Sequence, residues 1–202
     1  MDFDQNDITN IQAAISEGGK IWENPLINGF KTKLKNYYRG LKNECCYCKR
    51  VFVGEFSYSI DIEHILPKSK FQNLMFTTYN LNISCKRCNM KIKKSRTDFL
   101  LDIEQVKETP KDKTLYKIIH PNFEDYETHI EYFVNIDNQK KIIKYNILSD
   151  SEKGTYTFEY FKLKELEIDT VSQAQGVKEK TELLSDIDPN IIEQLENVFK
   201  DL

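Results

Sequence analysis

Two Cys-x-x-Cys pairs constrain this chain more than any other feature of its sequence. Cys45 and Cys48 form the first pair, and Cys85 and Cys88 form the second, which begins 37 positions after Cys48. Four thiolates presented by two tight turns are the usual ligand set of a closed, tetrahedral zinc site. We therefore expect one structural Zn²⁺ that joins two distant segments. Cys46 lies too close to its neighbours to share that ion and is expected to be unliganded.

The segment between the two pairs contains polar side chains suited to phosphodiester hydrolysis. Alternation of apolar and polar residues predicts a strand on which Asp61 and Glu63 share one face and His64 lies on the other. Asn80 precedes a second short strand, and Asn89 lies in a basic helix that follows it. An acid, an imidazole and two amides at these spacings are what a one-metal phosphodiesterase needs.

The same residues resemble the HNH endonuclease family, whose ββα-metal fold places such a motif between two zinc knuckles. The resemblance implies that His64 is the general base, because an imidazole of ordinary pKa, about 6.5, is mostly neutral at pH 7. It implies that Glu63 and Asn89 hold a catalytic Mg²⁺ or Mn²⁺, and that Asn80 braces the loop and orients His64. Many relatives have Asp at the position of Glu63, so Asp61 is an alternative ligand from the same strand face.

Positive charge gathers around this motif. Residues 31–96 contain 15 Lys and Arg against four Asp and Glu, a net charge of +11, which leaves −14 for the rest of the chain. Such a block favours a polyanion, because each neutralised phosphate releases counterions. We expect DNA as the substrate, while the sequence leaves RNA open. The residues expected to contact backbone phosphates are Lys68, Lys70, Lys86, Arg87, Lys91, Lys93 and Lys94.

The pattern along the chain predicts an α+β protein in three parts. Residues 1–42 form an N-terminal helical segment, residues 43–97 the zinc-stapled ββα-metal core, and residues 98–202 an acidic α/β elaboration. The N-terminal helices are expected at 7–17 and 26–41. In the C-terminal part, the expected elements are strands at 115–119, 130–134 and 141–145, a hairpin turn at 137–139, a strand or helix within 156–168, and helices within 172–202.

The other two histidines, His120 and His129, lie among carboxylates in the C-terminal part. No ligand spacing joins them, so a structural turn is expected there rather than a second metal centre. The form of this segment after the core is similar to the small HNH nucleases of retron-associated and Septu-type anti-phage systems. That resemblance implies a role in defence and an ATPase partner protein.

The leading interpretation is a metal-dependent HNH endonuclease that hydrolyses DNA. One alternative is a zinc-knuckle module that binds nucleic acid without catalysis, and another is an interaction subunit scaffolded by the zinc core. The first residues contain no apolar signal segment, and no apolar run approaches the roughly 20 residues needed to cross a bilayer. We therefore expect a cytoplasmic protein without membrane association.

Overall fold

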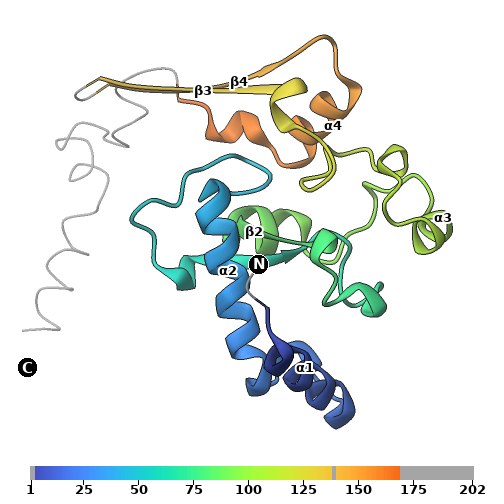
Figure 1. Ribbon diagram of the computed structural model, residues 1–202. Helices are drawn as coiled ribbons and strands as arrows, with labels where there is room; N and C mark the ends of the chain where they lie inside the picture. Colours follow the sequence, from blue (N-terminus) through green and yellow to red (C-terminus); the bar gives the residue numbers. More distant parts are fainter. Residues whose placement is uncertain (1–2, 138–139, 169–202) are drawn as a thin grey trace, which may run out of the picture. The chain divides into compact units, whose positions relative to one another are not determined.

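A computed structural model describes residues 3–137 and 140–168 of the chain (Figure 1). This part of the chain combines helices with two separate two-stranded sheets, so the expected α+β class is confirmed. It divides into two compact units: the first comprises Met1–Tyr132 and Tyr145–Glu165, and the second comprises Phe133–Lys144 and continues from Leu166. Within the described residues, no helix is long and apolar enough to span a membrane. The division into three parts at residues 42 and 97 stays a prediction.

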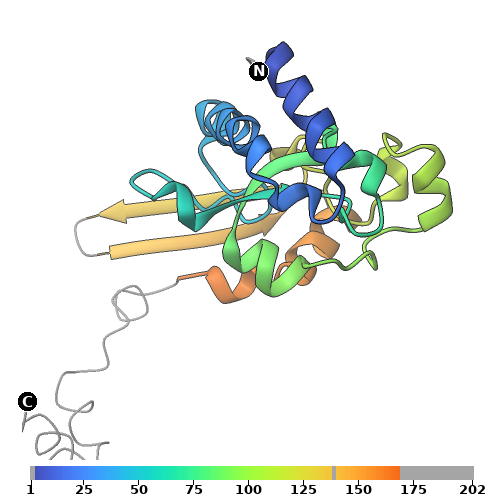
Figure 2. The same cartoon turned by 90° about the horizontal axis from the view of Figure 1, so that it is seen from below.

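Two helices form the N-terminal segment, as expected. They are α1 (Gln5–Glu17) and α2 (Asn28–Lys42), joined by the short 3-10 helices η1 (Ile21–Glu23) and η2 (Pro25–Ile27). Asp4 caps α1 and exchanges hydrogen bonds with Asp7, while Gly18, with φ of 72°, ends the helix. Lys33 of α2 contacts both capping carboxylates at 2.7 Å. This contact holds α1 beside the start of α2, as Figures 1 and 2 show.

The expected order of strand, long loop, strand and helix is present. The strands β1 (Ile60–His64) and β2 (Leu81–Cys85) pair antiparallel, with His64 opposite Leu81. Single-turn 3-10 helices lie around them at η3 (Ser57–Ser59), η4 (Gln72–Leu74) and η5 (Thr78–Asn80). The basic helix that follows, η6 (Arg87–Lys93), is a π-helix rather than an α-helix. Its last hydrogen bond runs from the Lys94 amide to the Asn89 carbonyl, at 2.7 Å. Such wide turns are frequent at functional sites.

A small apolar cluster attaches the N-terminal helices to the strand pair. Phe30 and Leu34 of α2 are buried against Leu81 of β2, and the rings of Trp22 and Phe76 pack around them. In Figure 1, α2 passes in front of β2. Because burying large apolar side chains stabilises the folded state by about 1.5–3 kcal/mol each, this cluster fixes α2 next to the residues of β1.

The C-terminal part contains α3 (Ile103–Glu108), β3 (Ile130–Asp137), β4 (Lys140–Ile147) and α4 (Glu152–Tyr160), with η7 (Lys113–Leu115), η8 (Tyr126–Thr128) and η9 (Leu163–Leu166). The strands β3 and β4 form the expected two-stranded sheet. Residues 156–168, which fitted a strand or a helix, are mostly helical. Part of the expected 137–139 turn and the helices expected within 172–202 lie outside the described residues.

The strand expected at 115–119 is wrong. This segment makes one isolated bridge, between Leu100 and Tyr116, in the part of the chain that the structure describes. Its apolar side chains are buried at successive positions, including Ile118 and Ile119, rather than on alternate ones. The Lys117 amide binds the Phe99 carbonyl and the Leu101 amide binds the Leu115 carbonyl, so the pairing stops after one bridge and is too short to form a strand.

Candidate active site and zinc centre

The four cysteines of the two Cys-x-x-Cys pairs meet in one buried cluster. Their sulfur atoms all lie within 4.8 Å of one another, and the Sγ atoms of Cys48 and Cys85 are 3.8 Å apart. Four sulfurs at about 2.3 Å from a tetrahedral zinc are separated by about 3.8 Å, so the cluster fits this ion. Cys45 and Cys88 complete the set, and Cys46 is outside it. These four residues can therefore hold one structural zinc.

The local backbone explains how the first pair reaches the second. The Cys45 amide binds the Arg50 carbonyl, and the Cys46 amide binds the Ile83 carbonyl of β2. Between Cys45 and Arg50 the chain reverses its direction through Lys49, whose φ of 58° lies in the left-handed region. The knuckle is thereby bonded to the strand that ends at Cys85.

The Asn80 side chain bonds to the loop between the strands, and within the described residues it makes no hydrogen bond to His64. The side chain is almost completely buried and contacts backbone only: Oδ1 accepts from the Leu66 amide at 2.7 Å, and Nδ2 donates to the carbonyls of Leu66 and Leu74, each at 3.1 Å. Three bonds to two points of one loop fix its path out of β1. Asn80 thus holds the chain directly after His64 and has no free atom for an ion.

His64 lies at the end of β1 in a state suited to accept a proton. Its Nε2 is 3.0 Å from the Met75 carbonyl oxygen. A carbonyl only accepts hydrogen bonds, so Nε2 carries the hydrogen and Nδ1 keeps the lone pair. Trp22 packs edge-on against the ring with centroids 4.3 Å apart, and burial lowers the pKa of His64 to about 4. The imidazole is therefore neutral at pH 7.

The two acids of β1 have different partners on η6. Asp61 and Glu63 share a strand face, as expected. Asp61 meets Asn89 and Glu63 meets Lys93, four residues further along the helix. Asn89 Nδ2 donates to Asp61 at 3.2 Å, whereas Lys93 Nζ lies 2.7 Å from Glu63 Oε1 and donates to the His64 carbonyl at 2.6 Å. The structure thus ties both acids to the same helix by different chemistry.

Glu63 is enclosed rather than placed beside the ion, contrary to the expectation from the motif. Its carboxylate is fully buried, and besides Lys93 it accepts from the Tyr47 hydroxyl at 3.0 Å. Burial raises the pKa of Glu63, and the Lys93 ammonium opposes this shift. Its Oε2 has no hydrogen-bond partner among the described residues. The alternative acid, Asp61, is partly exposed and is also contacted by Lys86 at 3.3 Å.

An open cleft of about 900 Å³ runs past these side chains. Asp61, His64 and Asn89 line it, together with Lys68 and Lys94, and Glu63 does not. The opposite lining comes from the N-terminal segment: Trp22, Glu23, Asn28, Lys31, Thr32 and Lys35. The cleft therefore brings together an imidazole base, a carboxylate and an amide, which are oxygen donors of the kind that hard divalent cations take, and several ammonium groups.

Comparison with known proteins finds similarity in the segment that contains the cysteines and most of the cleft residues. The HNH endonuclease family matches residues 45–95, from the first clustered cysteine to the end of the cleft-lining residues. Residues 45–95 are thus similar to an HNH domain, and this segment is called the HNH domain from here on. Over 80 residues the chain is 35% identical to the Septu protein PtuB of Bacillus thuringiensis, and this stretch is 40% of the chain and 28% of that protein. The chain thus spans well under two thirds of the relative's length. No solved structure matches it.

The cationic residues of the HNH domain differ in what they contact. Lys68 and Lys94 line the cleft, where Lys68 pairs with Glu23 at 2.9 Å, and Lys91 is exposed outside it. Lys70 donates to the Thr97 hydroxyl, and Lys86 is paired with the carboxylate of β1 described above.

Two of the expected phosphate-binding residues face the protein itself. Lys93 is buried, with 1% of its surface exposed. Arg87 donates to the carbonyls of Phe161 and Lys162 and pairs with Glu165 at 3.0 Å. Neither side chain is placed to meet a nucleic acid, because both of their cationic groups already have protein acceptors.

Sequence reasoning missed three residues of the cleft, Trp22, Lys31 and Lys35. The signals were present: Trp22 is the single tryptophan, and two lysines four apart on a predicted helix share one face. Lys31 and Lys35 were counted in the basic block of residues 31–96, but they were not assigned to the site because they lie outside the motif.

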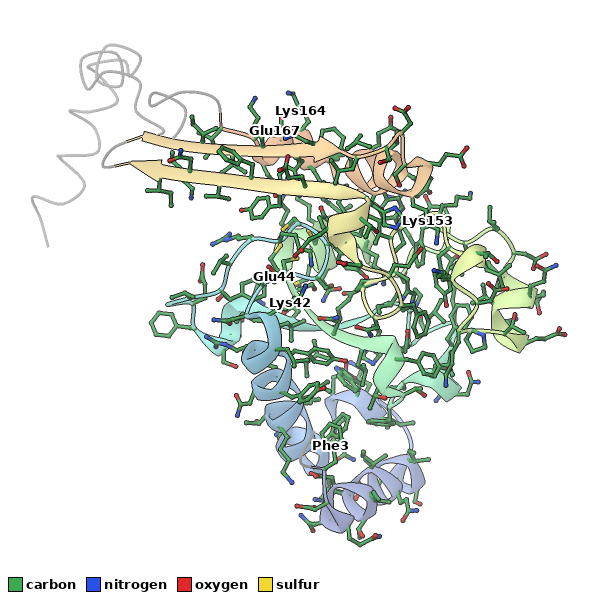
Figure 3. All side chains as sticks on the ribbon, turned by 45° about the horizontal axis from the view of Figure 1, so that its top comes forward. Phe3, Lys42, Glu44, Lys153, Lys164 and Glu167 are labelled. Carbon is green, nitrogen blue, oxygen red and sulfur yellow. The ribbon has the colours of Figure 1, made fainter. Side chains whose placement is uncertain are left out.

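The remaining histidines fit the expected structural turn. His120 is buried, with its ring stacked on Phe123 at 4.0 Å, and burial lowers its pKa to about 3. His129 Nδ1 contacts the Ser151 hydroxyl at 2.6 Å. The nearby Lys153, labelled in Figure 3, pairs with Glu124 at 2.8 Å. Among the described residues, only the four cysteines form a group of three or more His, Cys, Asp or Glu side chains that could hold a metal.

Proposed function

We propose that this protein is a metal-dependent endonuclease that hydrolyses DNA, with His64 as the general base. The observation that carries the proposal is the place of His64: it lines the cleft, and its Nε2 lies 3.0 Å from the Met75 carbonyl, which leaves Nδ1 as the basic nitrogen. The match of residues 45–95 to the HNH endonuclease family supports it. A module that only binds nucleic acid has no need of such a base.

Asp61 and Asn89 are the residues we assign to a catalytic Mg²⁺ or Mn²⁺. Both line the cleft, and the Asn89 amide already contacts the Asp61 carboxylate. Two protein oxygens are enough for Mg²⁺, which keeps several waters and binds substrate phosphate. When bound, the ion neutralises charge on the phosphate and stabilises the leaving oxygen. Glu63 is assigned to the ion pair with Lys93 instead.

The protein's own residues divide the remaining work. His64 Nδ1 removes a proton from the attacking water, while its Nε2–H stays on the Met75 carbonyl and keeps the ring in one orientation. Asn80 fixes the loop that leaves the base. Lys68 and Lys94 bind phosphates beside the scissile bond, and such contacts position the substrate without reading its bases.

We further propose that the protein acts in anti-phage defence together with an ATPase partner. The similarity to the Septu protein PtuB supports a defence role. The partner follows from the resemblance to Septu-type nucleases. A nuclease with little sequence preference would attack its host genome, so its activity must be restrained. Tagged protein recovered from its native host should retain an ATPase, and recovery without any such subunit would contradict the partner.

Cleavage of plasmid DNA by the purified protein tests the nuclease. We expect cutting with Mg²⁺ or Mn²⁺, none with EDTA, and a loss of roughly 10²- to 10⁴-fold in rate for His64→Ala with DNA binding retained. Zinc content equal to wild type shows that the variant is folded. Cutting by His64→Ala at the wild-type rate would overturn the mechanism, and binding without any cutting would favour the zinc-knuckle alternative.

Trp22 allows the metal assignment to be tested without turnover. It is the only tryptophan and lies beside His64 in the cleft, so Mn²⁺ titration should quench its fluorescence. Asp61→Asn should weaken this quenching strongly, and Glu63→Gln should leave the midpoint near wild type. If Glu63→Gln weakens the quenching and Asp61→Asn does not, Glu63 is the metal ligand and the assignment to Asp61 is wrong.

A further inference from the structure

The cleft has a second wall that lies outside the HNH domain. Six lining residues come from Trp22 to Lys35, whereas the family match begins at residue 45. The apolar contacts of Phe30 and Leu34 with Leu81 fix this wall in place. The N-terminal helices are thus positioned to contact whatever the HNH domain binds.

The lysine side chains near the start of α2 face either α1 or the cleft. Lys33 faces α1, where it pairs with Asp4 and Asp7. Lys31 and Lys35, four residues apart, line the cleft, and neither has an ion-pair partner within the part of the chain that the structure describes. Lys35 instead donates to the Ser57 carbonyl at 2.9 Å. Two half-buried ammonium groups that no carboxylate contacts directly can take an anion, although Glu23 and Asp61 line the same cleft.

The surroundings of each ammonium support this. Burial lowers the pKa of Lys31 and of Lys35. A bound phosphate would reverse that shift, because an opposite charge favours the protonated amine. Lys35 lines the same cleft as Asp61, the proposed metal ligand.

Trp22 links the two walls. Its ring lies 5.3 Å from Lys31 Nζ and 5.9 Å from Lys68 Nζ, so it contacts one ammonium from α2 and one from the HNH domain. The same ring packs edge-on against His64. The ammonium groups of both walls are therefore held around the base.

We propose that Lys31 and Lys35 of α2 bind the phosphodiester backbone of the DNA, so that the substrate is gripped between α2 and the HNH domain. This inference rests on the proposed function, because it takes DNA as the ligand. Side chains four apart on a helix lie about 5–6 Å from each other, so both lysines reach phosphates of one passing strand.

Salt-dependent binding of a short synthetic DNA duplex tests the second wall. The full-length chain carries His64→Ala so that no DNA is cut, and anisotropy gives the affinity at several KCl concentrations. Lys31→Ala with Lys35→Ala should reduce the slope of log affinity against log salt by roughly two units, since each lost phosphate contact removes about 0.9. Lys31→Arg with Lys35→Arg should keep the slope.

A matched control removes two lysines away from the cleft. Lys42, labelled in Figure 3, and Lys107 are exposed on α2 and α3, and each has only a surface ion pair. Lys42→Ala with Lys107→Ala should leave the slope near that of the parent. If the slope falls equally in both double variants, or does not fall in Lys31→Ala with Lys35→Ala, the proposed DNA contact of α2 is wrong. Failure of the wild type to cut DNA would overturn only the proposed function, because the slope is measured on an uncut duplex.

Discussion

Replacement of Lys93 by Met tests whether the ion pair behind His64 holds the site together. The pair joins Lys93 to Glu63, whose side chains are 1% and 0% exposed, and Lys93 Nζ lies 2.7 Å from Glu63 Oε1. Without the ammonium, the Glu63 carboxylate keeps only the Tyr47 hydroxyl, because Oε2 has no partner among the described residues. Removing one member of a buried pair costs about 3–5 kcal/mol, so we expect a loss of that order in the free energy of unfolding at pH 7.

The loss should depend on pH in a defined direction. Burial already raises the pKa of Glu63, and removal of Lys93 raises it further. A carboxyl whose pKa is raised in the folded state contributes stability below its unfolded pKa of about 4.3, and this contribution is lost as pH rises through the folded pKa. The free energy of unfolding of Lys93→Met should therefore be closest to that of wild type at low pH. Above a pH of about 4.3 the difference should grow by up to about 1.4 kcal/mol per pH unit.

Urea unfolding of the zinc-loaded protein measures these differences by linear extrapolation. The double variant Glu63→Gln with Lys93→Met should regain most of the loss, because a neutral pair leaves no buried charge. Lys86→Met is the surface control, since Lys86 is 40% exposed and its pair with Asp61 is 3.3 Å long. A loss below about 1 kcal/mol for Lys93→Met, or additive effects in the double variant, would refute the reasoning.

Three further predictions follow from the zinc cluster, the base and the end of η6. Elemental analysis should find one zinc per chain, and Cys88→Ser should lose both zinc and solubility, because the cluster joins two distant segments. Burial lowers the pKa of His64 to about 4, so stability should fall as pH drops from about 6.5 towards 4, and His64→Ala should remove on the order of 3 kcal/mol of that fall in acid unfolding curves. Lys94 has φ of 52°, so Lys94→Gly should raise the melting temperature relative to Lys94→Ala, while both weaken DNA binding.

Local chemistry made part of the site predictable from sequence. Ligand spacing identified Cys45, Cys48, Cys85 and Cys88, because two tight turns offer four thiolates that few other arrangements satisfy. The loop-bracing role expected for Asn80 agrees with its three backbone bonds. These inferences depend on contacts that are short in sequence or on a ligand set that is nearly unique.

The parts that sequence reasoning missed depend on contacts between distant segments. Residues 115–119 resemble a strand by composition, but their pairing with residues 99–101 amounts to one isolated bridge. Lys93 belongs to a basic run and was assigned to phosphate, although its ammonium pairs with an acid 30 positions earlier. Charge alone does not tell which lysine of a run points inward, because this depends on the packing of η6 against β1.

The choice between Asp61 and Glu63 follows from the partner that each strand position meets. A carboxylate that is fully removed from water needs an opposite charge, and Lys93 supplies one to Glu63. Asp61 contacts the uncharged Asn89 amide and the Lys86 ammonium, which is 40% exposed and lies 3.3 Å away, and it remains partly exposed at the cleft. A cation entering the cleft competes there with a solvated surface lysine, whereas at Glu63 it would have to displace a buried ammonium at 2.7 Å. The Lys93 ammonium also binds the His64 carbonyl, so the pair that keeps Glu63 from the proposed metal site also fixes the backbone of the proposed base.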